Sequence, residues 1–138
     1  MGTQKVILDT NILISAFGWP GKPKTILNMV LAGQLELVIP QAQMDEIGRV
    51  VTYPRLKFTK DQQQRFVSLL TTIATVVNTT LRLDIVKDDP SDNIFLETAV
   101  EHHVSVIVSG DDHLLKLKKY QDVQIFTPAQ FLDIFFNT

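Results

Sequence analysis

Short, uniformly apolar runs alternate along this chain with stretches whose apolar residues recur at helical spacing, and this alternation most constrains the fold. Residues 5–8, 35–39 and 104–108 have the length and apolar character of buried strands. A weaker run at 76–77 and a last one at 125–126 add two further predicted strands. Apolar strands separated by helices are typical of a parallel sheet covered on both faces, so we predict an α/β fold.

The segments between these runs carry recognisable helix boundaries. Thr59-Lys60-Asp61-Gln62 and Thr127-Pro128-Ala129-Gln130 both have the form of a capping box, in which a Thr hydroxyl and a Gln amide satisfy free N–H groups. Gly33 is predicted to end the helix that begins near Pro23. A further helix is predicted over about residues 91–103, after the acidic segment that contains Asp88 and Asp89.

Composition limits the class of protein. A chain of 138 residues with 45% hydrophobic and 20% charged residues fits one folded domain, which we expect to span residues 1–138. The absence of cysteine excludes disulfides and thiolate zinc sites. A net charge of −2 argues against a basic nucleic-acid coat protein. No signal peptide or membrane-length apolar stretch is visible, so we expect a soluble, cytoplasmic protein without a membrane partner.

Acidic residues follow the predicted strands at the edge where ligands bind in parallel sheets. Asp9 directly follows the first strand, and Asp111 follows the strand at 104–108. Asp92 lies in the first turn of a helix, and Glu46 lies in the helix after the second strand. Clustered carboxylates repel one another unless a cation compensates, and their oxygens suit Mg²⁺ or Mn²⁺. Each acid taken alone is equally typical of a helix cap or a solvated surface; their joint order favours a metal site.

Two of these acidic segments resemble motifs of the PIN-domain family, in particular of bacterial and archaeal toxin components of toxin–antitoxin pairs. Val6-Ile7-Leu8-Asp9-Thr10-Asn11 is similar to the opening motif, an apolar strand followed by Asp-Thr-Asn. Ser109-Gly110-Asp111 with Leu114-Leu115 is similar to the third acidic motif.

The other two acids also have counterparts in that family. Asp89-Pro90-Ser91-Asp92-Asn93 with Phe95-Leu96-Glu97 resembles the segment that carries the acid just upstream of the third motif. Glu46, within Met44-Asp45-Glu46-Ile47, stands where the family places its helical acid. The resemblance extends over nearly the whole chain, and all of its acidic positions are filled.

The resemblance implies a three-layer α/β/α sandwich with a central parallel sheet of about five strands. It also implies Mg²⁺- or Mn²⁺-dependent cleavage of single-stranded RNA, an antitoxin protein as partner, and a homodimer. Carried over by position, Asp9, Glu46, Asp92 and Asp111 would bind the metal, and Asn11 and Ser109 would orient carboxylates or water. Asp112 is either an outer ligand or a helix cap, and the role of His113 beside it is open.

Three other functions fit the acidic residues of this chain less well. A PIN-like module that binds RNA or protein without cutting would usually lack an acid, and this chain retains all of them. A receiver domain needs paired acids after the first strand, and an aspartyl phosphotransferase needs Asp-x-Asp there, whereas Asn11 holds the second position. Two basic groups could contact phosphate or be ordinary solvated surface. They are Arg49, Arg55, Lys57 and Lys60, and Lys116, Lys118 and Lys119.

Overall fold

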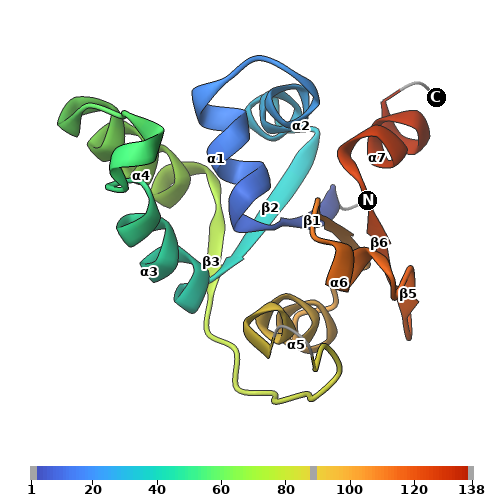
Figure 1. Cartoon of the computed structure of the whole chain (residues 1–138). Coiled ribbons are helices and arrows are strands. Elements are labelled where there is room, and N and C mark those ends of the chain that lie inside the picture. The colour runs from blue at the N-terminus through green and yellow to red at the C-terminus, as the bar shows by residue number, and fades with distance from the viewer. Residues whose placement is uncertain (1–2, 88–89, 137–138) are drawn as a thin grey trace.

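A six-stranded sheet in the order β3-β2-β1-β4-β6-β5 forms the centre of the computed structural model, which describes residues 3–87 and 90–136 (Figure 1). The strands are β1 (Gln4–Leu8), β2 (Leu35–Pro40), β3 (Thr75–Val77), β4 (Val106–Val108), β5 (Lys119–Tyr120) and β6 (Val123–Phe126). Five of them pair in parallel, with Leu8 opposite Val108 and Ile39 opposite Val76. The predicted parallel sheet of about five strands is therefore confirmed.

The short edge strand β5 was not predicted. It pairs antiparallel with β6, and Gln121 makes the connection with a left-handed backbone, at φ 51°. Lys119 and Tyr120 carry no alternating or apolar pattern, so nothing in the sequence marked them as a strand.

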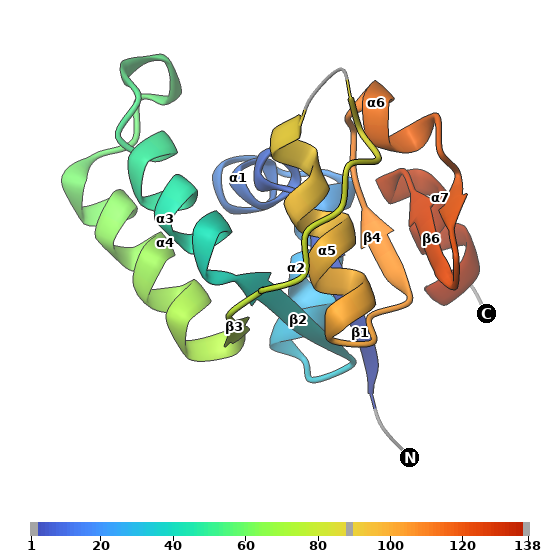
Figure 2. The ribbon, with the colours of Figure 1, turned by 90° about the horizontal axis from the view of Figure 1, so that it is seen from below.

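Helices cover both faces of the sheet (Figures 1 and 2). They are α1 (Thr10–Gly18), α2 (Lys22–Leu31), α3 (Gln41–Val50), α4 (Lys60–Ile73), α5 (Asn93–Glu101), α6 (Asp112–Leu115) and α7 (Pro128–Phe135), with 3₁₀ turns η1 (Pro54–Leu56) and η2 (Pro90–Asp92). Apolar residues of α1 to α4 and α7 share one buried cluster, and those of α5 and α6 share another on the opposite face. The three-layer arrangement is thus observed. Among residues 3–87 and 90–136, no helix has both the length and the apolar character needed to cross a membrane.

The predicted helix boundaries hold where side-chain chemistry fixed them. Thr59 and Thr127 both form complete capping boxes with the Gln three residues later. Gly33 ends α2 with φ 79°, a backbone conformation that favours glycine, and its N–H donates to Val30 O.

The region around α5 differs from the prediction in its limits. Asp88 and Asp89 lie outside the described residues. The predicted helix over 91–103 begins as the turn η2 and ends at Glu101, because His103 adopts a left-handed backbone, at φ 57°. Only Val106–Val108 of the predicted strand 104–108 pairs within the sheet.

Residues 78–87 form neither helix nor strand and run along α5 (Figure 2). Side chains spaced four residues apart on α5 accept hydrogen bonds from the backbone of this segment, which would otherwise lack partners. The bonds run from Leu81 N–H to Glu101 (2.8 Å), from Leu83 N–H to Glu97 (2.8 Å) and from Val86 N–H to Asn93 (2.8 Å). The segment is thereby joined to α5 along the length of the helix, as far as Asn93, the residue after Asp92.

Candidate functional site

Asp9 stands at the centre of the predicted site, where β1 ends and α1 begins. As N-cap of α1 it accepts a hydrogen bond from Ile12 N–H at 2.8 Å on Oδ1. Its Oδ2 accepts from the Ser109 hydroxyl and from Gly110 N–H at 3.2 Å. The side chain is buried, so these donors fix the carboxylate firmly in place.

Burial sets the protonation behaviour of this carboxyl group. Loss of hydration raises the pKa of Asp9 above its ordinary value, and the negative charge of Asp111 raises it further. Hydrogen bonds from Ser109, Ile12 and Gly110 oppose this effect but leave the net direction upward. A cation placed beside Asp9 would stabilise its ionised form.

Ser109 connects the ends of the two central strands. It is fully buried, donates its hydroxyl to Asp9 and accepts Asp111 N–H at 2.9 Å. Asp111 in turn caps α6, accepting His113 N–H at 2.7 Å. The serine therefore lies behind the acidic cluster as a support and has no exposed surface of its own.

Glu46 reaches the site from α3 and is held there by Thr10, whose hydroxyl donates to Glu46 Oε1. Gln43, one helical turn earlier, is buried and donates Nε2 to Leu8 O at 2.7 Å, which joins α3 to the end of β1. Thr10 and Gln43 were not among the predicted site residues. Their signals were present: Thr10 sits inside the Asp-Thr-Asn motif, and Gln43 shares a helix face with Glu46.

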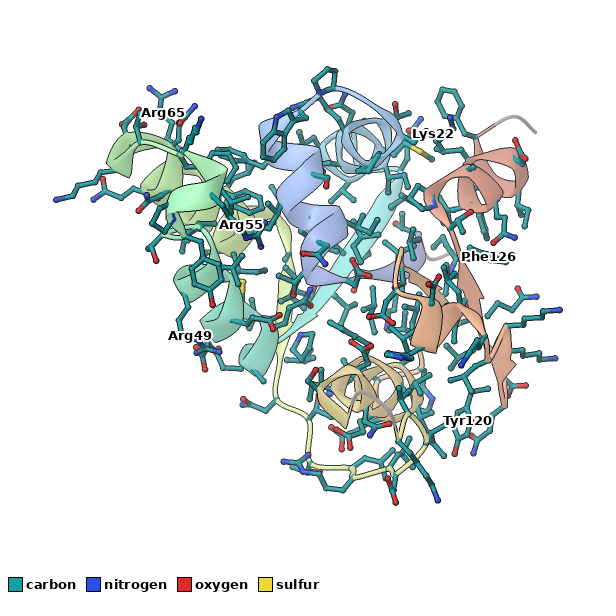
Figure 3. The ribbon with its side chains drawn as sticks, viewed as in Figure 1. Lys22, Arg49, Arg55, Arg65, Tyr120 and Phe126 are labelled. Atoms are coloured by element: carbon teal, nitrogen blue, oxygen red, sulfur yellow. The ribbon has the colours of Figure 1, made fainter. Side chains whose placement is uncertain are left out.

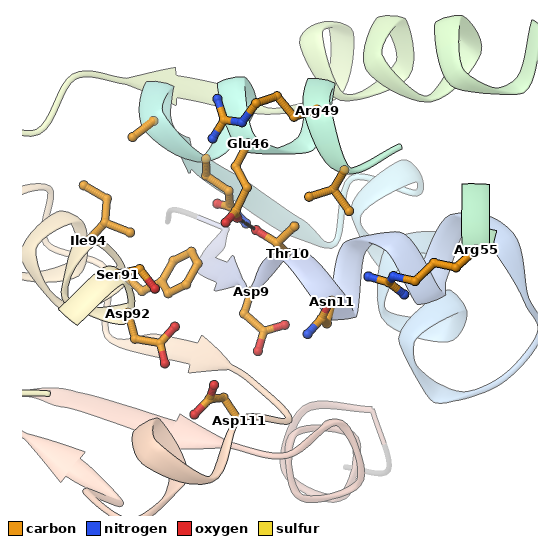
Figure 4. A pocket seen from close by; sticks show the side chains of 14 residues that line it. Asp9, Thr10, Asn11, Glu46, Arg49, Arg55, Ser91, Asp92, Ile94 and Asp111 are labelled. Carbon is orange, nitrogen blue, oxygen red and sulfur yellow. Dashed lines mark hydrogen bonds between the residues drawn. The ribbon is translucent and has the colours of Figure 1, made fainter. Parts of the chain in front are cut away.

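The four predicted acids line one cavity of about 400 Å³ (Figure 4). Asp9, Asp92 and Asp111 point toward one another in Figure 4, with Glu46 approaching from the α3 side. Asn11 lines the same cavity from the first turn of α1. These side chains come from four separate parts of the sequence: the ends of β1 and β4 place Asp9 and Asp111, α3 places Glu46, and η2 places Asp92.

Two neighbouring residues with open roles occupy different positions. Asp112 is exposed and does not line the acidic cavity. His113 lies closer, with Nδ1 3.6 Å from Asp111 Oδ1, and ligand atoms of Asp92, Asp111 and His113 lie within 4.8 Å of one another. The oxygen-rich donor set fits Mg²⁺ or Mn²⁺, and an added imidazole would suit Mn²⁺ better than Mg²⁺.

Comparisons with known proteins give a consistent picture. A family model described as the PIN domain matches residues 5–113, a span that contains every predicted site residue. An uncharacterized protein of Methanocaldococcus jannaschii is 27% identical over 143 residues, covering 95% of this chain and 91% of that protein.

Among solved structures, this fold resembles VapBC2 from Rickettsia felis, which was crystallised bound to a DNA fragment from their promoter. The TM-score is 0.62 at 15% identity, covering 88% of this chain and 97% of that chain. At this level of identity the likeness supports the fold.

Proposed function

The chain belongs to the PIN-domain family, and from this premise we propose that it is a metal-dependent endoribonuclease that hydrolyses single-stranded RNA. The observation that carries the proposal is the cavity in which Asp9, Asp92 and Asp111 converge and which Glu46 also lines. Such a concentration of negative charge around a buried aspartate is unfavourable without a cation. It is therefore better explained by metal binding than by independent helix caps.

In this proposal the residues divide into ligands and supports. Asp9, Glu46, Asp92 and Asp111 would hold Mg²⁺ or Mn²⁺, and Asn11 at the cavity wall would orient water or phosphate oxygens. Ser109 and Thr10 would keep Asp9 and Glu46 in position through their hydroxyl groups. When bound, the cation would lower the pKa of a water molecule and offset negative charge on the phosphodiester.

The alternative is a PIN-like module that binds RNA or protein without cutting it. That function would place no demand on the full set of carboxylates. Here all four line the same cavity, and the positions of Asp9 and Glu46 are secured by buried or partly buried hydrogen bonds. This supports cleavage over binding alone.

The experiment is a cleavage assay on labelled single-stranded RNA with Mg²⁺, Mn²⁺ or EDTA. The parent is expected to cut only with metal, and Asp9→Asn is expected to lose the activity while remaining folded. Asp112→Asn is the matched control, because it removes an exposed carboxylate outside the cavity and should cut like the parent. Equal cutting by Asp9→Asn and the parent would show that the site is assigned wrongly. A folded parent that binds RNA and Mn²⁺ but never cuts would favour the binding module.

We further propose that the chain is the toxin of a toxin–antitoxin pair, on the strength of its motif resemblance to such toxins. A small antitoxin would then cover the acidic cavity, and the toxin would commonly form a homodimer. The test is expression in a bacterial host without a partner protein. Growth arrest by the parent and normal growth with Asp9→Asn, at equal protein levels, would support it; equal growth with both would contradict it.

A further inference from the structure

Two arginines line the acidic cavity on the side of α3 and η1. Arg49 lies in the last turn of α3, and Arg55 lies in η1 (Figures 3 and 4). In Figure 4, Arg55 lies beyond Asn11, away from Asp92 and Asp111. The wall of the cavity thus contains guanidinium groups as well as carboxylates: Arg49 lies beside Glu46 on α3, and Arg55 lies at the end away from Asp92 and Asp111.

Within residues 3–87 and 90–136, neither arginine is neutralised by a neighbouring acid. Across the described residues, no carboxylate lies within ion-pair distance of Arg49 or Arg55. Glu46 stands three residues before Arg49, a spacing that allows a helical ion pair, yet its carboxylate accepts from Thr10. Both arginines are exposed, so their charges are available to an anion that enters the cavity.

A hydrogen-bonded turn, anchored in the core, positions Arg55. Leu56 N–H donates to Tyr53 O at 3.0 Å, and Lys57 N–H donates to Pro54 O at 3.1 Å. Leu56 and Phe58 then pack on the buried cluster around α1 and α4. The backbone that carries Arg55 is therefore held by hydrogen bonds and core packing, and the exposed side chain extends from this fixed point.

An exposed aromatic ring adjoins this arginine. Tyr53 is 43% exposed, and the guanidinium carbon of Arg55 lies 5.9 Å from the centre of its ring. Sites that bind single-stranded nucleic acids typically combine two features: cationic groups along the phosphate backbone, and exposed aromatic rings on which bases stack. The combination favours a polynucleotide over an isolated phosphate.

We propose that Arg49 and Arg55 bind backbone phosphates of a single-stranded polynucleotide, beside the phosphodiester held at the carboxylates, and that a base stacks on the face of Tyr53 that Arg55 does not cover. The inference rests on the proposed function, since it assigns the course of the substrate across the same cavity. The net charge of the chain is −2, so the protein as a whole does not attract a polyanion. The electrostatic attraction must therefore come from cationic groups close to the binding site. Arginine suits this role because its planar fork donates two parallel hydrogen bonds to phosphate.

The second basic group lies elsewhere. Lys116, Lys118 and Lys119 do not line the acidic cavity, and Lys118 borders a separate hollow with Ile125 and Ile134. Two of these lysines, Lys118 and Lys119, therefore provide a matched control whose charge equals that of the two arginines.

The test measures binding of a fluorescent, single-stranded oligoribonucleotide by anisotropy, using the full chain and Ca²⁺ in place of Mg²⁺. A gel verifies that the probe stays intact. The double variant Arg49→Gln/Arg55→Gln should weaken binding on the order of tenfold and reduce the salt slope of log K by roughly 1.4, the value for two single-strand phosphate contacts. Lys118→Gln/Lys119→Gln should change both quantities far less. Arg49→Lys/Arg55→Lys should restore the slope but only part of the affinity.

Three results would overturn the inference: equal weakening by both glutamine pairs, an unchanged salt slope in the arginine pair, or no binding by the parent at low salt. Cleavage is scored separately. A parent that binds through the arginines but never cuts would refute the nuclease proposal alone. If the parent cuts RNA but the Arg49→Gln/Arg55→Gln variant binds it as tightly as the parent does, this inference alone would be refuted.

Discussion

Ser109 illustrates how a single buried residue supports the candidate site. Its hydroxyl bridges Asp9 and the backbone of Asp111, with no exposed surface. Ser109→Ala should lower the free energy of unfolding by about 1–3 kcal/mol, because it leaves buried polar groups without a partner. It should also slow RNA cleavage, since Asp9 is then less well fixed.

Urea unfolding and the cleavage assay together check this prediction. Ser105→Ala is the control, because Ser105 is exposed and the bond that its hydroxyl accepts, from Gln4 Nε2 at 3.3 Å, is long and exposed; its backbone bond to Gln124 N–H is kept in the variant. If Ser109→Ala matched the parent in both stability and rate, the bridge would have neither role.

The charge of Asp9 leads to a prediction about metal binding that does not depend on cutting. A cation that binds only the folded state stabilises it by about 2.7 kcal/mol at a concentration 100 times its Kd. Excess Mn²⁺ should therefore raise the melting temperature of the parent, and the rise should be lost in Asp9→Asn and in Asp111→Asn. Differential scanning fluorimetry with and without EDTA measures it, and Asp112→Asn should keep the rise. An equal rise in all variants would place the metal elsewhere.

The sequence identified carboxylates that line one cavity, but not the residues that hold them there. Asp9 and Asp111 were selected because they follow strands, and Glu46 and Asp92 because of their positions in helices; all four line the same cavity. Gln43 was not selected: its place on the helix face of Glu46 could have marked it as a neighbour of the site, but its bond to Leu8 O depends on how α3 packs against β1. Such packing cannot be inferred from residue types alone.

Among the elements, α5 depends on the extended segment 78–87 for part of its anchoring. The Glu101 carboxylate accepts the Thr80 hydroxyl at 2.7 Å and Leu81 N–H at 2.8 Å, and these bonds lower the pKa of Glu101. A lowered pKa in the folded state means that ionised Glu101 stabilises the protein at neutral pH. This contribution is lost as pH falls below the ordinary range of glutamate, roughly 4.3, through the lowered value.

The prediction is that Glu101→Gln destabilises the protein at pH 7 and that its difference from the parent narrows as the solution is acidified. Chemical denaturation at a series of pH values measures this difference. Asp61→Asn is the control, because the exposed Arg65–Asp61 pair should contribute little at any pH. A difference that stays constant with pH would mean that the charge of Glu101 is not what holds the segment.

Sequence patterns predicted several strands and helix starts, but they did not predict the segment that runs along α5. Strands β1, β2 and β4 were predicted because a strand buried on both faces is uniformly apolar. The capped starts of α4 and α7 were predicted because Thr and Gln at fixed spacing satisfy the first N–H groups. The course of segment 78–87 was not predicted, because its backbone N–H groups donate hydrogen bonds to side chains of α5, which come later in the chain. No local periodicity records such pairing.

In the molecule as a whole, the central strand joins two hydrophobic layers. Val6 and Leu8 of β1 belong to the cluster under α1 to α4 and α7, and Ile7 belongs to the cluster under α5 and α6. All three are fully buried. A disturbance in one layer is thus transmitted to the other through a strand that both share.

We therefore expect one cooperative unfolding transition, and Ile7→Ala tests it. The substitution should cost about 2–5 kcal/mol, because it opens a cavity in the layer of α5. The single tryptophan, Trp19, packs against Phe58 at the edge of the other layer and reports on that layer by fluorescence. Its transition in urea should shift to lower concentration together with the circular-dichroism transition, whereas Val76→Ala on the exposed edge strand β3 should shift both much less. A Trp19 transition that stayed in place while circular dichroism shifted would mean that the two layers unfold independently, and that β1 does not couple them.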